Sequence, residues 1–266
     1  MGRLLYGLQF EHAGRRRCIN EKACFYRFTD DGHSAKIYGG RCDGMNLIQK
    51  AEQKAIYFFE HDATGHDWQH TKRVTDTAVF LAETEGADTE LCRIAALLHD
   101  VADDKFHDQD GDGLNYVQRW LKENDCPEKM QKDILSIINT VSFKGGHNKT
   151  PESLEAEIVQ DADRLDAIGA IGTARCFMFA GAFNEAMHDP DILPKTYGSS
   201  KAYREEKSTA VNHFYEKLLT IKETLHTPAA RTIGEERHMF MKRFLETFLG
   251  EWEGTAFNKE NSTPKG

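Results

Sequence analysis

The chain has 266 residues, of which 39% are hydrophobic and six are proline, and this suits one sizeable folded domain with an appendage. Its formal net charge of −9 argues against a general nucleic-acid-coating protein, because such proteins usually present a basic stripe or a high pI. The six cysteines form no C-x-x-C pair, and no apolar run reaches about 18 residues, the length that spans a membrane. With no signal-peptide core either, we expect a reduced, cytoplasmic protein that binds neither nucleic acid nor membranes.

Residues 1–44 are mixed in composition and poorly periodic, so we treat them as an unassigned, poorly structured N-terminal appendage. Three short stretches have strand character and would make at most a small hairpin: 4–10, 24–28 and 35–38. The cysteines of this region, with His33, match no common zinc-site spacing. Residues 254–266 are typical of a frayed C-terminal tail, which leaves 45–253 as the main domain.

Apolar residues recur at helical spacing through almost all of 45–253, and this predicts an all-α domain without internal repeats. Asp67 is expected to cap one helix, and Asp88 or Thr89 another, because short polar side chains accept the unpaired N–H groups of a first turn. The expected helices cover about 45–60, 67–85, 89–101, 114–123, 127–141, a long one from after Pro151 through Asp163 to about 183, 203–225 and 235–252.

A histidine and an aspartate, His99 and Asp100, directly follow the buried-type residues Leu97 and Leu98. Burying both without partners would cost on the order of several kcal/mol. A metal ion removes that cost, because it neutralises the carboxylate and occupies an imidazole nitrogen. The alternative is a helix that simply ends in polar residues.

Asp163 lies inside a second apolar helical run. It is either a metal ligand or the partner of a buried salt bridge, for which Arg164 and Arg175 are candidates. Asp161 and Asp166 flank it and need not be inside.

The third polar site is His70, at the start of a predicted helix. His66 precedes it by four residues, so the two could chelate a metal from one helix face, and His66 is a rival ligand. The alternative is an exposed, histidine-rich helix start.

Taken together, the order H … HD … D across successive helices resembles the HD-domain superfamily of metal-dependent phosphohydrolases. The motif H-x-x-R-V is present at 70–74, L-L-H-D with a following acidic pair at 97–104, and A-D-R-L at 162–165. The resemblance implies a helical HD-domain bundle that holds one divalent metal with His70, His99, Asp100 and Asp163. Two nitrogen and two carboxylate ligands suit Mn, Mg, Fe, Ni, Co or Zn, and the sequence does not choose among them.

The resemblance covers about 45–252, and the segments 142–146, 161–175 and 213–219 look like a compact subgroup that acts on nucleotides. It implies hydrolysis of nucleoside triphosphates to monophosphate and pyrophosphate by a metal-activated water. Asp103 or Asp104 would orient or deprotonate that water, with Asp103 preferred. Three cations are candidate phosphate contacts: Lys105, Lys144 and Arg175. Solvated acids and surface cations are the alternatives for these five residues.

Other functions share some of these features. A 5′-nucleotide phosphomonoesterase or a phosphodiesterase would use the same metal site. A metal- or nucleotide-binding sensor would not need the acidic pair, and a helical interaction module would bind no metal. The loop 108–113 resembles the start of a calcium loop, but its twelfth position is Arg119, which would repel the ion. The chain has neither a P-loop nor a G-x-S-x-G elbow, which argues against P-loop nucleotidases and serine hydrolases.

Overall fold

The computed structural model describes residues 45–59, 67–103, 106–107, 112–141, 150–195 and 208–255, together with the backbone of two short strands. The chain divides into two units, Met1–Met45 and Asn46–Gly266. In the first, β1 (Phe25–Phe28) pairs antiparallel with β2 (Ala35–Tyr38), so two of the three expected strands are present. The third, 4–10, lies outside the described residues, and the limits 45–253 for the main domain stay a prediction.

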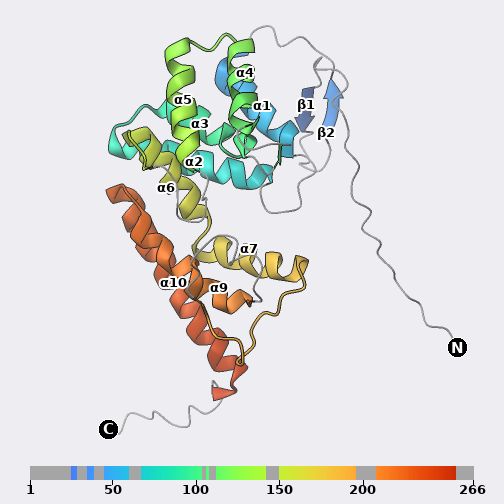
Figure 1. The fold of residues 1–266 in the computed structure, drawn as a ribbon, viewed down its shortest axis with the longest axis vertical. Coiled ribbons are helices and arrows are strands. Elements are labelled where there is room, and N and C mark those ends of the chain that lie inside the picture. The colour runs from blue at the N-terminus through green and yellow to red at the C-terminus, as the bar shows by residue number, and fades with distance from the viewer. Residues whose placement is uncertain are drawn as a thin grey trace, which may run out of the picture. The chain divides into compact units, whose positions relative to one another are not determined.

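The second unit is helical wherever it has regular structure among the described residues, which confirms the predicted all-α domain (Figure 1). Its elements are α1 (Leu47–Phe59), α2 (Trp68–Glu85), α3 (Thr89–Leu98), the 3-10 turn η1 (Asp100–Ala102), α4 (Asp112–Glu123), α5 (Glu128–Val141), α6 (Leu154–Asp166), α7 (Gly169–Ala182), α9 (Ala210–Glu216), the 3-10 segment η3 (Leu218–Thr224) and α10 (Pro228–Trp252).

Short polar side chains begin most of the helices that position the site. Asp67 accepts the N–H of His70, and Asp88 accepts that of Leu91, so both act as N-caps. Ser153 caps α6 in the same way. Each cap satisfies a backbone donor that the helix itself leaves unpaired.

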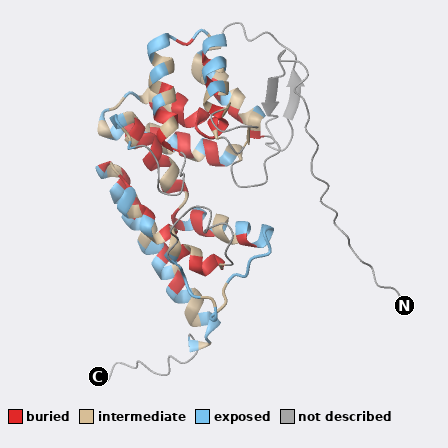
Figure 2. Ribbon diagram, in the orientation of Figure 1, coloured by how far each residue is buried: buried red, intermediate tan, exposed pale blue. Residues whose placement is uncertain are grey.

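The core of this unit forms where α2 packs against both α3 and α6, and where α5 packs against α3 and α6. Fully buried side chains of Leu81, Ile94, Leu98, Ile134 and Ile158 fill the contacts, and buried residues gather on the facing sides of these helices (Figure 2). Burying each such side chain stabilises the fold by roughly 1.5–3 kcal/mol. This packing fixes the positions of α2, α3 and α6 relative to one another.

The predicted single helix from after Pro151 to about 183 is wrong, because the chain breaks it into α6 and α7, bent by 62°. Ile168 is extended (φ −123°, ψ 171°), and Gly169 has φ +77°, a left-handed conformation that favours glycine. No proline marks the break, and the apolar pattern runs through it.

The segment predicted as one helix over 203–225 also differs. Its described part, from residue 208 on, consists of α9 followed by the 3-10 segment η3, interrupted at Lys217, where φ is −141°. The last helix starts earlier than predicted, at Pro228, a residue suited to a first turn because its missing N–H needs no partner there. Among the described helices no single one is long and apolar enough to cross a membrane, although the bent pair α6–α7 passes that test by length and composition.

Candidate metal centre

Four predicted ligands meet where α2, α3 and α6 converge. His70 lies in the first turn of α2, His99 and Asp100 at the junction of α3 and η1, and Asp163 in α6. Because α2 packs against both neighbours, side chains from three separate stretches of sequence face one point.

The ring nitrogens and carboxylates lie within a few ångströms of one another. The Nε2 atom of His70 is 3.3 Å from Oδ2 of Asp100 and 3.5 Å from Oδ1 of Asp163. The Nε2 atom of His99 is 3.5 Å from Oδ1 of Asp100 and 3.8 Å from Oδ1 of Asp163. His70, His99 and Asp100 are buried, whereas the Asp163 side chain is 28% exposed, so the cluster opens on the side of Asp163.

The donor atoms of this cluster fit a divalent cation. His99 Nδ1 lies 2.7 Å from the carbonyl oxygen of Ala96, which can only accept, so Nδ1 carries the proton. His99 Nε2 is buried, makes no hydrogen bond within the described part of the chain and faces two carboxylates. A cation between them would give this nitrogen a partner and offset the negative charge of the carboxylates. Candidate ligand atoms of His70, His99 and Asp100 lie within 4.8 Å of one another, so these three residues could hold a metal.

Behind His70 lies a buried carboxylate, Asp166, to which the sequence assigned no role. Its Oδ2 is 2.7 Å from His70 Nδ1, and it binds two arginines. Arg73 donates from Nε to Oδ1 at 2.7 Å and from Nη2 to Oδ2 at 3.0 Å. Arg175 donates from Nη1 to Oδ2 at 2.6 Å. The expectation that Asp166 need not be inside is wrong. Only 5% of the residue is exposed, and these partners satisfy the hydrogen-bonding capacity of its buried carboxylate.

These contacts raise the pKa of His70 and lower the pKa of Asp166. Burial alone would lower the pKa of His70, but hydrogen bonds to Asp100 and Asp166 and the charges of Asp100 and Asp163 raise it to about 9. Burial would raise the pKa of Asp166, but the hydrogen bonds from His70 and Arg73 and the positive charge of Arg175 hold it well below its usual range. In the metal-free protein, His70 is therefore protonated at neutral pH.

The metal-free protein is expected to lose stability as the pH rises from 6.5, the ordinary pKa of histidine, to about 9. The pKa of His70 is raised on folding, so its stabilising contribution is complete below 6.5 and disappears through about 9. Thermal unfolding after chelation, compared between the wild type and His70→Gln, checks this. The difference between the two proteins should shrink toward high pH, and a constant difference over this window would contradict it.

The structure describes only some of the other predicted site residues. Asp103 follows η1 half-buried, and its N–H donates to the carbonyl of Asp100. Arg175 lies on α7, not on the helix of Asp163, and it binds Asp166, so its phosphate role stays a prediction. Several predicted residues or segments lie outside the described residues: His66, Asp104, Lys105, Lys144, most of the loop 108–113 and the cysteines before residue 45.

Asp163 does not form the salt bridge considered as the alternative to ligation. Arg164 donates instead to the carbonyl of Thr224 and contacts the ring of His226, while Arg175 binds Asp166. The neighbouring Asp161 is also buried, contrary to expectation. It accepts the N–H groups of His226 and Thr227 where α10 begins.

A further cation, Lys217 at the end of α9, is electrostatically coupled to the metal cluster. Burial lowers the pKa of its ammonium group, the negative charge of Asp163 opposes this, and the positive charge of Arg175 adds to it. Lys217 lies in the segment 213–219 that resembles the nucleotide subgroup, but it was assigned no role of its own, because the charged residues near it belong to α6 and α7.

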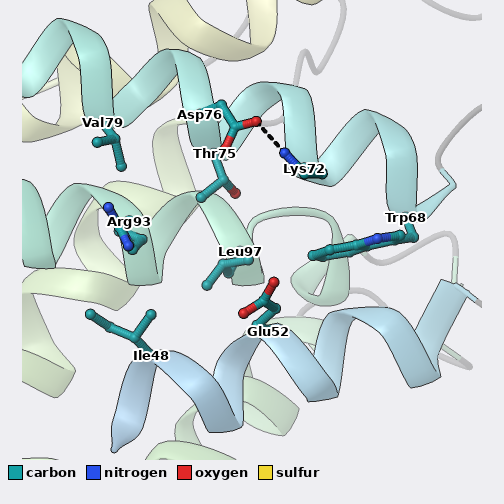
Figure 3. Close-up of a pocket in the computed structure, with 9 residues that line it drawn as sticks. All are labelled: Ile48, Glu52, Trp68, Lys72, Thr75, Asp76, Val79, Arg93 and Leu97. Carbon is teal, nitrogen blue, oxygen red and sulfur yellow. Dashed lines mark hydrogen bonds and ion pairs between the residues drawn. The ribbon is translucent and has the colours of Figure 1, made fainter. Parts of the chain in front are cut away.

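A cavity of about 260 Å³ lies between α1, α2 and α3, lined by Ile48, Trp68, Lys72, Arg93 and Leu97 among others (Figure 3). His70 stands two residues after Trp68, which is roughly 200° around the helix axis. The cavity therefore lies on the face of α2 that points away from the cluster, and it is no part of the candidate metal centre.

The comparisons with known proteins cover the same region. A family model described as HD domain matches residues 67–168. Bacillus subtilis YpgQ, an uncharacterised protein, is 37% identical over 206 residues, which cover 76% of this chain and 93% of YpgQ. Its crystal structure in complex with ADP has 33% identity and a TM-score of 0.61, covering 77% of this chain and 96% of that one.

Two further similarities concern hydrolases. The structure of an HD-superfamily hydrolase from Bacillus thuringiensis is 40% identical with a TM-score of 0.63, and covers 77% of this chain and 96% of its own. A shorter match of 82 residues, 40% identical, joins this chain to the symmetrical bis(5′-nucleosyl)-tetraphosphatase of Halalkalibacterium halodurans, covering 31% of this chain and 38% of that protein. All four residues of the cluster lie within the segment 67–168 that the family model matches.

Proposed function

The chain belongs to the HD-domain superfamily, and from this premise we propose that it is a metal-dependent phosphohydrolase that cleaves nucleoside triphosphates to monophosphate and pyrophosphate. The observation that carries the proposal is the buried cluster of His70, His99 and Asp100, with the carboxylate of Asp163 at its open side.

The four residues of the cluster supply the ligands for a divalent cation. His70, His99, Asp100 and Asp163 would hold the ion. When bound, a divalent ion lowers the pKa of a water molecule and polarises a phosphoryl oxygen. The chain then needs no nucleophile of its own.

Other side chains would accept the proton of the attacking water and neutralise the negative charge of the substrate phosphates. Asp103, directly after η1, is the preferred acceptor for the proton of the attacking water, with Asp104 as the other candidate. The positive charge of Lys217 acts on Asp163, and Lys105, Lys144 and Arg175 are the predicted phosphate contacts.

Two of the relatives support a nucleotide substrate. YpgQ was crystallised with ADP, and the tetraphosphatase acts on a dinucleoside polyphosphate. Both ligands contain a nucleoside attached to a chain of phosphates, which is the chemistry that we assign to this site.

The test is a screen of the full-length protein, stripped of metal and then supplied with Mn²⁺. The panel contains ribo- and deoxyribonucleoside mono-, di- and triphosphates and dinucleoside polyphosphates, with products separated by chromatography. We expect monophosphate and pyrophosphate in equal amounts from triphosphates, and neither product without metal.

Other outcomes would replace the proposal. Inorganic phosphate released from monophosphates would indicate a phosphomonoesterase, and cleavage of dinucleoside polyphosphates alone would indicate a phosphodiesterase-type activity. Metal binding without turnover of any panel member would favour the sensor.

A further inference from the structure

His70 has two ring nitrogens, and only one of them faces the metal cluster. Its Nε2 atom points at Asp100 and Asp163, while Nδ1 lies 2.7 Å from Oδ2 of Asp166. A neutral imidazole carries its proton on one nitrogen and a lone pair on the other. A proton on Nδ1 leaves Nε2 able to bind a metal, whereas a proton on Nε2 makes ligation from that atom impossible.

A competing contact could place that proton on the wrong nitrogen. Nη1 of Arg175 is 3.1 Å from His70 Nδ1 and can only donate. If it donated to the ring, His70 would carry its proton on Nε2. The carboxylate of Asp166 prevents this, because it accepts from Arg175 at 2.6 Å and from the ring at 2.7 Å.

The second arginine, Arg73, fixes the carboxylate itself. It binds both oxygens of Asp166 from the turn of α2 that follows His70. This paired contact defines the plane of the carboxylate. A carboxylate held in this way is directed at Nδ1 and cannot rotate toward the metal cluster as an additional ligand.

The break between α6 and α7 makes the contact with Arg175 possible. In one continuous helix, nine residues separate two side chains by roughly 13–14 Å along the axis. The extended Ile168 and the left-handed Gly169 instead turn α7 by 62°, and Arg175 returns to Asp166 on the preceding helix.

From this geometry we propose that Asp166 is a positioning residue, which, clamped by Arg73 and Arg175, keeps the proton of His70 on Nδ1 and thereby sets the affinity of the site for its metal. The inference rests on the metal site of the proposed function, but it concerns metal affinity and not the identity of the substrate. The alternative is that Asp166 only forms a structural ion pair with the two arginines. In that case, removing its carboxylate would not change the metal affinity of the site.

The test measures metal affinity and the ring nitrogens of His70 in three proteins: the wild type, Asp166→Asn and Asp76→Asn. Asp76 is the matched control, because it is an exposed carboxylate on α2 that binds Lys72 at 2.6 Å. Nitrogen NMR of the Zn²⁺-loaded, full-length protein reports which ring atom carries the proton, with His70→Gln to assign the signal. Titration with Mn²⁺ gives the affinity.

We expect a protonated Nδ1 in the wild type and in Asp76→Asn, and a rise of about 10- to 100-fold in the metal Kd of Asp166→Asn, the usual effect of removing a partner of a ligating histidine. A wild-type His70 that binds zinc through Nδ1 would overturn the inference, and this observation does not depend on the variant folding. Wild-type metal affinity in a folded Asp166→Asn would also overturn it while leaving the proposed function intact. Wild-type protein that takes up no metal would overturn both.

Discussion

Replacing His99 with alanine is expected to lower metal-dependent hydrolysis by more than about 100-fold. His99 Nε2 is buried and faces the carboxylates of Asp100 and Asp163, so its loss removes a nitrogen ligand from the centre of the cluster. Changes to groups that merely orient a ligand already cost about 10- to 100-fold, and removing a ligand costs more. Initial rates with Mn²⁺ on the substrate found in the screen provide the measurement, and Asp163→Ala should behave in the same way.

The control for this experiment is His238→Ala. His238 lies in α10, and the charged groups that act on it are Lys222, Glu223, Glu235 and Lys242, none of them in the cluster. It should keep the wild-type rate. Activity of His99→Ala within a few-fold of the wild type, with an unchanged unfolding curve, would contradict the assignment of His99.

Asp161→Ala is expected to lower the free energy of unfolding by about 3 kcal/mol, the largest stability effect that we foresee. The Asp161 carboxylate is fully buried and accepts the N–H groups of His226 and Thr227 and the hydroxyl of Thr227. Each buried donor left without a partner costs about 1–3 kcal/mol. Urea unfolding followed by circular dichroism measures the loss.

Asp161→Asn is the matched variant for this prediction. It keeps one acceptor oxygen, so it should lose less stability than the alanine variant. If Asp161→Ala unfolds at the same urea concentration as the wild type, the junction between α6 and α10 does not depend on this side chain.

The fold class could be predicted because helical periodicity is a local signal. Asp67 was recognisable as a cap from its own neighbours, as was a second cap at Asp88 or Thr89; the structure confirms the first and decides the second for Asp88. The break at Ile168 and Gly169 could not be predicted in this way, because the apolar pattern continues through it. Its physical reason is tertiary, since it returns Arg175 to Asp166.

The same distinction applies to the site. His99, Asp100 and Asp163 stand out because polar side chains in or beside apolar helical runs require a partner, whereas His70 was identified by the resemblance to the HD-domain superfamily. The structure brings all four together. Asp166 was missed because its partners come from residues 73 and 175, far apart along the chain. Lys217 was missed for the same reason, since nothing near it in sequence indicates its proximity to Asp163.

The central claim is tested most directly by anomalous diffraction from crystals of the full chain soaked in Mn²⁺. The account predicts one strong peak, about 2.0–2.3 Å from Nε2 of His70, Nε2 of His99 and carboxylate oxygens of Asp100 and Asp163. The peak should be absent in crystals of His99→Ala. No peak at this position in the wild type, or a peak bound through Asp166 in place of His70, would contradict it.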